Sequence, residues 1–313
     1  MSRCGSGLIP LSIVVAVLAT WLWLRSFDIS AGALSLLFER LRWWPIVALL
    51  GLLAAHVAMS AWRWSLIEVR LGGGRPPFSH AFATGALSLA LGTFLPAPVV
   101  NVACRSLANR VNGTSGLRGA ISGGIDQIAD LAAIILVAIP AAVAFWHRDL
   151  GQYLIGAAAM VLLGLGLILG LPVIVRLAGS HFARSGFGRI APLVDRTLLV
   201  TLYGLSLLRV INLTVMTLAI HAATDAASVT AIVIGVPLIT LAISAAMLPG
   251  SLGVSEWSFS AVFASFGVAP GEIVVFVLAN RIVLTCLALL LALLVLLAMA
   301  RASLRREREA EVK

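Results

Sequence analysis

Charged residues are scarce in this sequence. Only 11% of the 313 residues are charged, whereas 61% are hydrophobic and the mean hydropathy is +1.07. Because soluble domains contain about 25% charged residues, this composition excludes an ordinary globular protein. Several uncharged runs of about twenty residues are long enough to cross a hydrocarbon core about 30 Å thick. These runs are continuous, not alternating as in a β-barrel, so the sequence predicts an all-α polytopic membrane protein.

The residues and motifs of common enzyme and metal sites are also lacking. Cys4, Cys104 and Cys286 are odd in number and have no metal-ligand spacing, and His56 and His80 have no partner in spacing. There is no H-E-x-x-H motif and no P-loop. The stretch "SLGVSEW" lacks the G-x-S-x-G spacing of a nucleophile elbow. Since no soluble stretch could form a catalytic domain, we expect no enzyme activity, no cofactor and no metal site.

Basic residues give the formal net charge of +9 and gather in short loops and at the C-terminus. This distribution is typical of cytoplasmic loops in membrane proteins, so we expect no nucleic-acid partner. The densest regions, 176–189 and 301–313, are predicted to be cytoplasmic. The apolar run 8–24, preceded by Arg3, is predicted to be an uncleaved first helix with a cytoplasmic N-terminus. A cleaved signal peptide is the alternative, but no A-x-A site follows the run.

Six segments are predicted to span the membrane, namely 8–24, 43–62, 119–145, 152–175, 198–220 and 273–300. Two further apolar segments do not fit as single spans. Segment 78–112 follows one basic cluster (Arg63, Arg70 and Arg75) and ends in a second (Arg105, Arg110 and Arg118), so a full crossing would leave one of them outside. Segment 230–267 follows a weakly charged outer loop, and the last helix must also begin outside to deliver the basic tail to the cytoplasm. Both segments are therefore predicted to enter the membrane and return as re-entrant hairpins.

Each predicted hairpin has a Leu-Pro pair where it turns. The helix-breaking residues at these tips are Pro96, Pro98, Pro249, Gly250 and Gly253. Because each hairpin lies between two predicted spans, we expect an inverted-topology repeat within one transmembrane domain, 1–313, with halves at about 43–145 and 198–300. Chance similarity between two stretches rich in leucine, alanine and glycine is the alternative. Tips that meet at mid-depth would offer free N–H groups to an anionic ligand.

Ionisable residues within the predicted membrane segments are candidates for binding, since each costs about 2.5–3.5 kcal/mol to insert. Asp126 and Asp130 are four residues apart and share one helix face. Glu256 follows the second break and is predicted to pair with Arg209 or Arg281. The candidate substrate-binding residues are Glu256, Arg281, Arg209, Asp126, Asp130, Ser251 and Arg105. For each, a structural ion pair is an equal alternative, and for Arg105 a positive-inside or lipid-headgroup role is favoured.

The segments "LPGSLGVSEWSFSAVFASFGV" and "LANRIVLT" resemble the lysylphosphatidylglycerol synthase transmembrane region, also called the flippase-like family. Its second-half motif, L-P-x-S-x-G-x-x-E and a later arginine, is matched by Leu248, Pro249, Ser251, Gly253, Glu256 and Arg281. The first-half motif is matched in part, by Leu95, Pro96, Asp130 and Arg105. Departures from it are Pro98 for arginine, Val100-Asn101 for Gly-Glu and Asp126-Gln127 for Glu-Arg. The resemblance extends from about Ser60 onward.

This resemblance implies a lipid flippase of the bacterial inner membrane, with membrane lipids as partners. Family members handle aminoacylated phospholipids, hopanoids or glycolipids. Because the sequence holds no counterpart of the lysyl-transferring domain of fused members, synthase activity is not expected. One alternative is a non-transporting accessory subunit of a lipid-modifying enzyme or glycosyltransferase. Another is an ion-coupled transporter of small solutes, in which Asp126 and Asp130 would bind a proton or cation.

Overall fold

The computed structural model describes residues 8–27, 31–177 and 195–311, and within these ranges every element is a helix. In chain order the elements are α1 (Leu8–Ser26), α2 (Ala31–Arg40), α3 (Trp43–Arg70), α4 (Phe78–Gly92), α5 (Ala97–Val111), α6 (Gly116–His147), α7 (Leu150–Leu177), α9 (Arg196–Thr224), α10 (Val229–Ala246), the short 3₁₀ helix η4 (Pro249–Ser251), α11 (Val254–Ser265) and α12 (Pro270–Glu311). The predicted basic loop 176–189 lies almost entirely outside the described residues.

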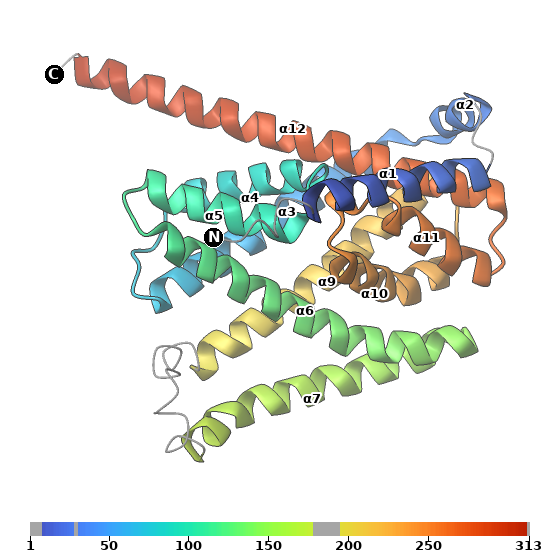
Figure 1. Ribbon diagram of the computed structural model, residues 1–313, viewed down its shortest axis with the longest axis horizontal. Coiled ribbons are helices and arrows are strands. Elements are labelled where there is room, and N and C mark those ends of the chain that lie inside the picture. Colours follow the sequence, from blue (N-terminus) through green and yellow to red (C-terminus); the bar gives the residue numbers. More distant parts are fainter. Residues whose placement is uncertain (1–7, 28–30, 178–194, 312–313) are drawn as a thin grey trace.

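Six of the described helices are long and apolar enough to cross a bilayer. They are Trp43–Arg70, Gly116–His147, Leu150–Leu171, Arg196–Thr224, Val229–Ala246 and Pro270–Ala302. Their number and character confirm the predicted all-α, multi-pass membrane fold. Figure 1 shows the long helices running obliquely along the longest dimension, with the α6–α7 and α11–α12 connections at one end and the end of α12 at the other.

Five of these helices overlap spans predicted from the sequence, and the sixth does not. The predicted span 8–24 falls in α1, whose described apolar part, Val14–Ser26, is shorter than a span. In its place the structure has α10, which the sequence assigned to the entering arm of the second hairpin. With 18 residues α10 is about 27 Å long, close to the lower limit for crossing the hydrocarbon core.

Helices α4 and α5 form a pair that turns at a Leu-Pro sequence. Each has 15 residues and is about 22 Å long, too short to cross the hydrocarbon core alone. Helix α5 begins directly after Pro96 and has Pro98 in its first turn, where a helix needs no donor N–H. The two helices pack against each other. That the pair enters the bilayer and returns to the same side stays a prediction.

A second pair, α10 and α11, turns at the other Leu-Pro sequence. Helix α10 ends at Ala246, and the next residue, Met247, has a left-handed backbone. Two glycines with positive φ, Gly250 within η4 and Gly253 after it, precede α11. Figure 1 shows α4–α5 and α10–α11 in opposite halves of the long dimension. This arrangement is compatible with the predicted inverted repeat, which itself stays a prediction.

The largest hydrophobic core lies among α3, α9, α10, α11 and α12, with contributions from α1, α2 and α4. Its most buried large side chains are Trp23, Leu37, Leu49, Ile220, Ile232, Phe263, Ile273 and Phe276. Helix α7 stands at the edge, against α6 and α9, and exposes most of its leucines. Such exposure is expected where the surrounding solvent is lipid, since apolar side chains need no burial there. Through this core α3, α9 and α12 pack against one another and beside the two helix pairs.

Candidate functional site

The turns of the two helix pairs contact each other at Thr93 and Gly250. Gly250 lies so close to Thr93 that a Cβ at position 250 would overlap the Thr93 carbonyl oxygen. The same Cβ would lie 3.1 Å from Nη2 of Arg281 on α12. Gly250 also has a φ of 55°, which favours glycine over residues with a side chain. We call the group formed by the turn between α10 and α11, Glu256 and Arg281 the tip site.

Within the tip site Arg281 and Glu256 form a loose ion pair. Nη1 of Arg281 donates a 2.6 Å hydrogen bond to the carbonyl oxygen of Gly250. Nε of Arg281 is 3.8 Å from Oε1 of Glu256, whereas a good charge-assisted hydrogen bond is about 2.7–2.9 Å long. Among the described residues, Oε2 of Glu256 has no hydrogen-bond partner although it is buried. The Arg281 side chain is 28% exposed. The site therefore has an unused acceptor and an accessible guanidinium.

Local backbone geometry places the carboxylate in this site. Gly253, with a φ of 79°, precedes α11 and puts Glu256 in the first turn of that helix, where the helix dipole favours a negative charge. Gly253 packs against Ala19 of α1, so a side chain there would displace α1. Nε1 of Trp257 donates to the Ala19 carbonyl oxygen at 3.1 Å. Ser251 is half-buried in the same turn.

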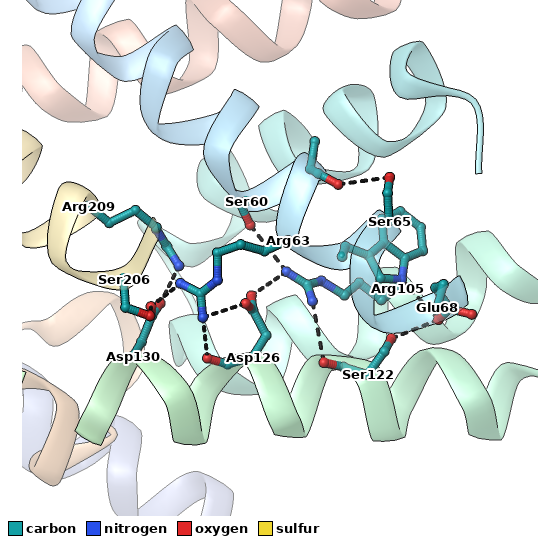
Figure 2. Close-up of polar contacts among 12 residues, drawn as sticks. Ser60, Arg63, Ser65, Glu68, Arg105, Ser122, Asp126, Asp130, Ser206 and Arg209 are labelled. Atoms are coloured by element: carbon teal, nitrogen blue, oxygen red, sulfur yellow. Dashed lines mark hydrogen bonds and ion pairs between the residues drawn. The ribbon is translucent and has the colours of Figure 1, made fainter. Parts of the chain in front are cut away.

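A second buried cluster of charges lies among α3, α5, α6 and α9. We call it the arginine–aspartate network, and its members are Arg63, Arg105, Asp126, Asp130 and Arg209. Figure 2 shows the three guanidinium groups in a row above the two carboxylates of α6. The aspartates are four residues apart and point the same way, as the sequence predicted.

Contacts in this network are short and shared. Arg63 bridges the two carboxylates, with Nη2 at 2.7 Å from Oδ1 of Asp126 and Nη1 bonded to Asp130. Nη2 of Arg105 is 2.5 Å from Oδ2 of Asp126. Arg209 bonds the second oxygen of Asp130, and its Nη2 lies 3.0 Å from Nε2 of His56. Each carboxylate thus binds two arginines, and little freedom is left for a ligand between them.

One further carboxylate, on Glu68, lies beside the network without an ion pair to its arginines in the described chain. Its Oε1 accepts hydrogen bonds from Nε1 of Trp64 at 3.0 Å, Nδ2 of Asn109 at 3.1 Å and Oγ of Ser122 at 2.8 Å. Glu68 is 3% exposed. Neutral donors therefore satisfy this charge at the junction of α3, α5 and α6.

The structure divides the residues proposed from the sequence into two groups. Glu256, Arg281 and Ser251 gather in the tip site, together with Pro249, Gly250 and Gly253. The other four proposed residues belong to the arginine–aspartate network, namely Asp126, Asp130, Arg105 and Arg209. Of the two partners predicted for Glu256, the structure has Arg281, because Arg209 is bound to Asp130. Arg105 is 3% exposed, which does not fit the surface role favoured for it.

Sequence reasoning missed Arg63 and Glu68. Arg63 is wholly buried, but it was grouped with the arginines of a cytoplasmic loop because the predicted span ended at residue 62. A signal was present in the spacing of Trp64 and Glu68, which are four residues apart on one helix face and joined by a hydrogen bond. Such a pair indicates that α3 continues beyond its apolar run.

Comparison with protein families adds an independent observation. The model described as "Lysylphosphatidylglycerol synthase TM region" matches residues 9–292, which include the tip site and the network. The chain belongs to this family. No curated protein matches the chain. The lysylphosphatidylglycerol synthase transmembrane-region family is associated with lipid-related membrane function, and this chain shares its membrane-embedded, helical character.

In this family member the tip site can hold a polar group without covalent chemistry. Arg281 can donate hydrogen bonds to an anionic group, and Oε2 of Glu256 can accept a hydrogen bond from an amine or hydroxyl. Among the described residues, no three histidine, cysteine, aspartate or glutamate side chains lie together. The arrangement thus suits reversible binding of a polar ligand that carries both a donor and an acceptor.

Proposed function

We propose that this protein is a flippase that moves a polar-headgroup lipid between the leaflets of the bacterial inner membrane. The observation that carries the proposal is the difference between the two charge clusters. In the network each carboxylate binds two arginines through short contacts, whereas in the tip site Glu256 has, among the described residues, one ion pair of 3.8 Å, and its partner Arg281 is partly exposed. The membership of the chain in a lipid-related membrane family supports the same conclusion.

The depth of Arg281 supports a polar surrounding for the tip site. Arg281 is the twelfth residue of α12, about 17 Å from its start, and so near the middle of the candidate span Pro270–Ala302. Exposing an arginine to hydrocarbon at that depth costs about 2.5–3.5 kcal/mol on insertion scales. Water or a lipid headgroup removes this cost. A headgroup phosphate at Arg281, with an amine or hydroxyl at Glu256, satisfies both side chains at once.

Contact between the two helix pairs supplies a means of alternating access. The tip site lies where Gly250 of one pair meets Thr93 of the other, and unwound backbone at such a position is tolerated only if it is buried or lines a cavity. In transporters built from inverted repeats, one half rocks against the other around a site of this kind. In this protein, rocking separates the two turns and so opens the site first to one side of the membrane and then to the other.

Reconstitution of the purified protein into liposomes tests this function. The assay follows a fluorescent headgroup-bearing lipid that an external reductant bleaches only in the outer leaflet. We expect Glu256→Gln and Arg281→Ala to abolish lipid movement while size-exclusion and unfolding profiles stay as in the wild type. Glu272→Gln, at the start of α12 and away from the tip site, is the matched control and keeps full activity.

Two results would change the proposal. If both tip-site variants move lipid at the wild-type rate, the assignment of the site is wrong. If the wild-type protein moves no lipid alone but co-purifies with a lipid-modifying enzyme or glycosyltransferase, the protein is an accessory subunit. Uptake of a small solute that depends on a pH gradient would instead favour the ion-coupled transporter.

A further inference from the structure

Helix α1 packs against η4 and α11, the two elements that form one side of the tip site. Figure 1 shows it, in dark blue, lying beside α11. Ala19 of α1 lies so close to Gly253 that a Cβ on the glycine would overlap the Ala19 Cβ. Gly253 is three residues from Gly250, whose carbonyl oxygen binds Arg281. Helix α1 therefore covers the turn that holds the Arg281 guanidinium.

Two indole hydrogen bonds attach α1 to α11. Nε1 of Trp23 donates to Oγ of Ser260 at 2.8 Å, and both side chains are buried. Nε1 of Trp257 donates to the Ala19 carbonyl oxygen at 3.1 Å, at an exposed position. Ser260 is four residues after Glu256 and so lies on the same face of α11. The contact with α1 thus runs along the side of α11 that carries the Glu256 carboxylate.

Helix α1 is attached by a narrow stripe of side chains. From Val14 to Ser26 only Ala16 and Trp23 are buried, and the other side chains are exposed or half-buried. The exposed ones are mainly apolar, as expected of a helix side that faces lipid. Helices α10 and α12 also pack against α11, but both contribute several buried side chains to the largest core. Because elements with few buried contacts open at the lowest cost, α1 is the neighbour of α11 that opens most easily.

A headgroup reaches Glu256 only if one of these neighbours moves. The Glu256 side chain is 6% exposed, whereas the proposed function requires an amine or hydroxyl at its carboxylate. The turn beneath α1 also holds two non-glycine residues with positive φ, Met247 at 47° and Ser251 at 56°. Such backbone persists where the surrounding structure enforces it, and it clusters at switch regions and ligand clamps. Release of α1 removes part of that enforcement.

We propose that α1 is a lateral gate of the tip site, which closes the site toward the bilayer and lifts from η4 and α11 when a lipid headgroup enters or leaves. The gate rests on the proposed function for the ligand that passes it, whereas the movement of α1 can be measured without transport. In the closed state the indoles of Trp23 and Trp257 hold α1 on α11. In the open state both indole hydrogen bonds are broken, and Glu256 is accessible from the side on which α1 lay.

Labelling of a thiol beneath α1 tests the opening. Ser260→Cys is introduced into the full-length protein after Cys4, Cys104 and Cys286 have been replaced by alanine, and the protein is treated with N-ethylmaleimide in liposomes. We expect Ser260→Cys to react steadily, because each opening of α1 exposes the thiol. Ser206→Cys, similarly buried but bonded to α6 within the arginine–aspartate network, is the control and stays unlabelled until the protein is unfolded.

Loss of one indole hydrogen bond should shift the gate toward the open state. Trp257→Phe keeps a ring at this position but removes the donor to Ala19, so we expect the Ser260→Cys thiol to react about twofold to tenfold faster. Trp62→Phe changes an exposed tryptophan of α3, which forms no part of the contact between α1 and α11, and leaves the rate unchanged. If Ser260→Cys reacts no faster than Ser206→Cys, or if Trp257→Phe does not raise its rate, α1 is not a gate.

A cross-link between α1 and α11 tests whether the opening serves lipid movement. The rings of Phe27 and Trp257 pack edge to edge with centroids 6.5 Å apart, and Trp257 is exposed to reagent. Phe27→Cys and Trp257→Cys are combined in the same cysteine-free protein and joined by a short bifunctional maleimide, which replaces the two rings. We expect the cross-linked protein to lose lipid movement. The same double variant treated with N-ethylmaleimide, which caps the thiols separately, retains it.

The outcomes separate the gate from the proposed function. If the cross-linked protein moves lipid at the rate of the capped control, lipid does not pass beneath α1, and the gate is wrong although the proposed function stands. If no form of the protein moves lipid, the proposed function fails, and the labelling of Ser260→Cys alone then decides whether α1 opens the tip site to another ligand.

Discussion

The charge imbalance of the arginine–aspartate network predicts that its members differ in their importance for stability. The network has three positive and two negative groups, so Asp126→Asn raises the excess to two positive charges, whereas Arg63→Met reduces it to none. Asp126 is fully buried and binds Arg63 at 2.7 Å and Arg105 at 2.5 Å. Loss of the aspartate is therefore expected to be the more damaging of the two changes.

The magnitudes follow from the contacts that each change removes. Asp126→Asn leaves two buried guanidinium groups short of a counter-charge, and removing one partner of a buried pair costs about 3–5 kcal/mol. Arg63→Met breaks bonds to two carboxylates, but Arg105 still pairs with Asp126 and Arg209 with Asp130. We expect this variant to lose about 1.5–3 kcal/mol, the cost of a charged hydrogen bond.

A double-mutant cycle gives the decisive measurement. The free energy of unfolding is measured by titration with SDS in mixed micelles for both single variants and for Arg63→Met combined with Asp126→Asn. Because the double variant restores the wild-type excess of one charge, its loss should fall below the sum of the single losses by about 0.5–3 kcal/mol. The reasoning is refuted if Arg63→Met is the costlier single change, or if the two losses simply add.

Three further predictions use the same unfolding measurement. Gly250→Ala should lower stability by about 1–3 kcal/mol, because its Cβ meets the Thr93 carbonyl oxygen, and wild-type stability would show that the turns do not touch. Gly119→Ala should cost a similar amount of about 1–3 kcal/mol, since the new Cβ meets the backbone of Arg105 where α5 crosses α6; Gly124→Ala, which meets nothing within 4 Å, is the control. Glu68→Gln should cost about 1–3 kcal/mol, because the three hydrogen bonds to Oε1 would then be made to a neutral amide oxygen instead of a charged carboxylate oxygen; an unchanged midpoint would show that the charge of Glu68 does not strengthen these bonds.

Local periodicity was enough to predict part of the site. Asp126 and Asp130 lie on one face because residues four apart on a helix always do, whatever the surrounding fold. The breaks at Pro96 and Pro249 were equally readable, because each proline has a second helix-breaking residue, Pro98 or Gly250, within two positions. The all-α, multi-pass architecture followed from long uncharged runs. Each of these features depends on neighbours in the sequence alone.

Features that depend on contacts between distant helices were not predictable in the same way. Glu256 could pair with Arg209 or Arg281 by charge and depth, and only the packing of α11 against α12 decides between them. Arg63 looked like the start of a basic loop because its counter-charges, Asp126 and Asp130, are more than sixty residues away. A charged residue can continue a membrane helix when another helix supplies its partner.

The two halves of the chain contain the same ionic contact with the signs exchanged. In the first, α5 presents Arg105 to Asp126 of α6, and in the second, α11 presents Glu256 to Arg281 of α12. Arg63 closes the first contact by binding the other oxygen of the same carboxylate, whereas the corresponding oxygen of Glu256 has no partner among the described residues. The first contact therefore fixes α5 to α6. The second, at 3.8 Å, is too long for a strong charge-assisted hydrogen bond, so α11 is held to α12 less firmly than α5 is held to α6.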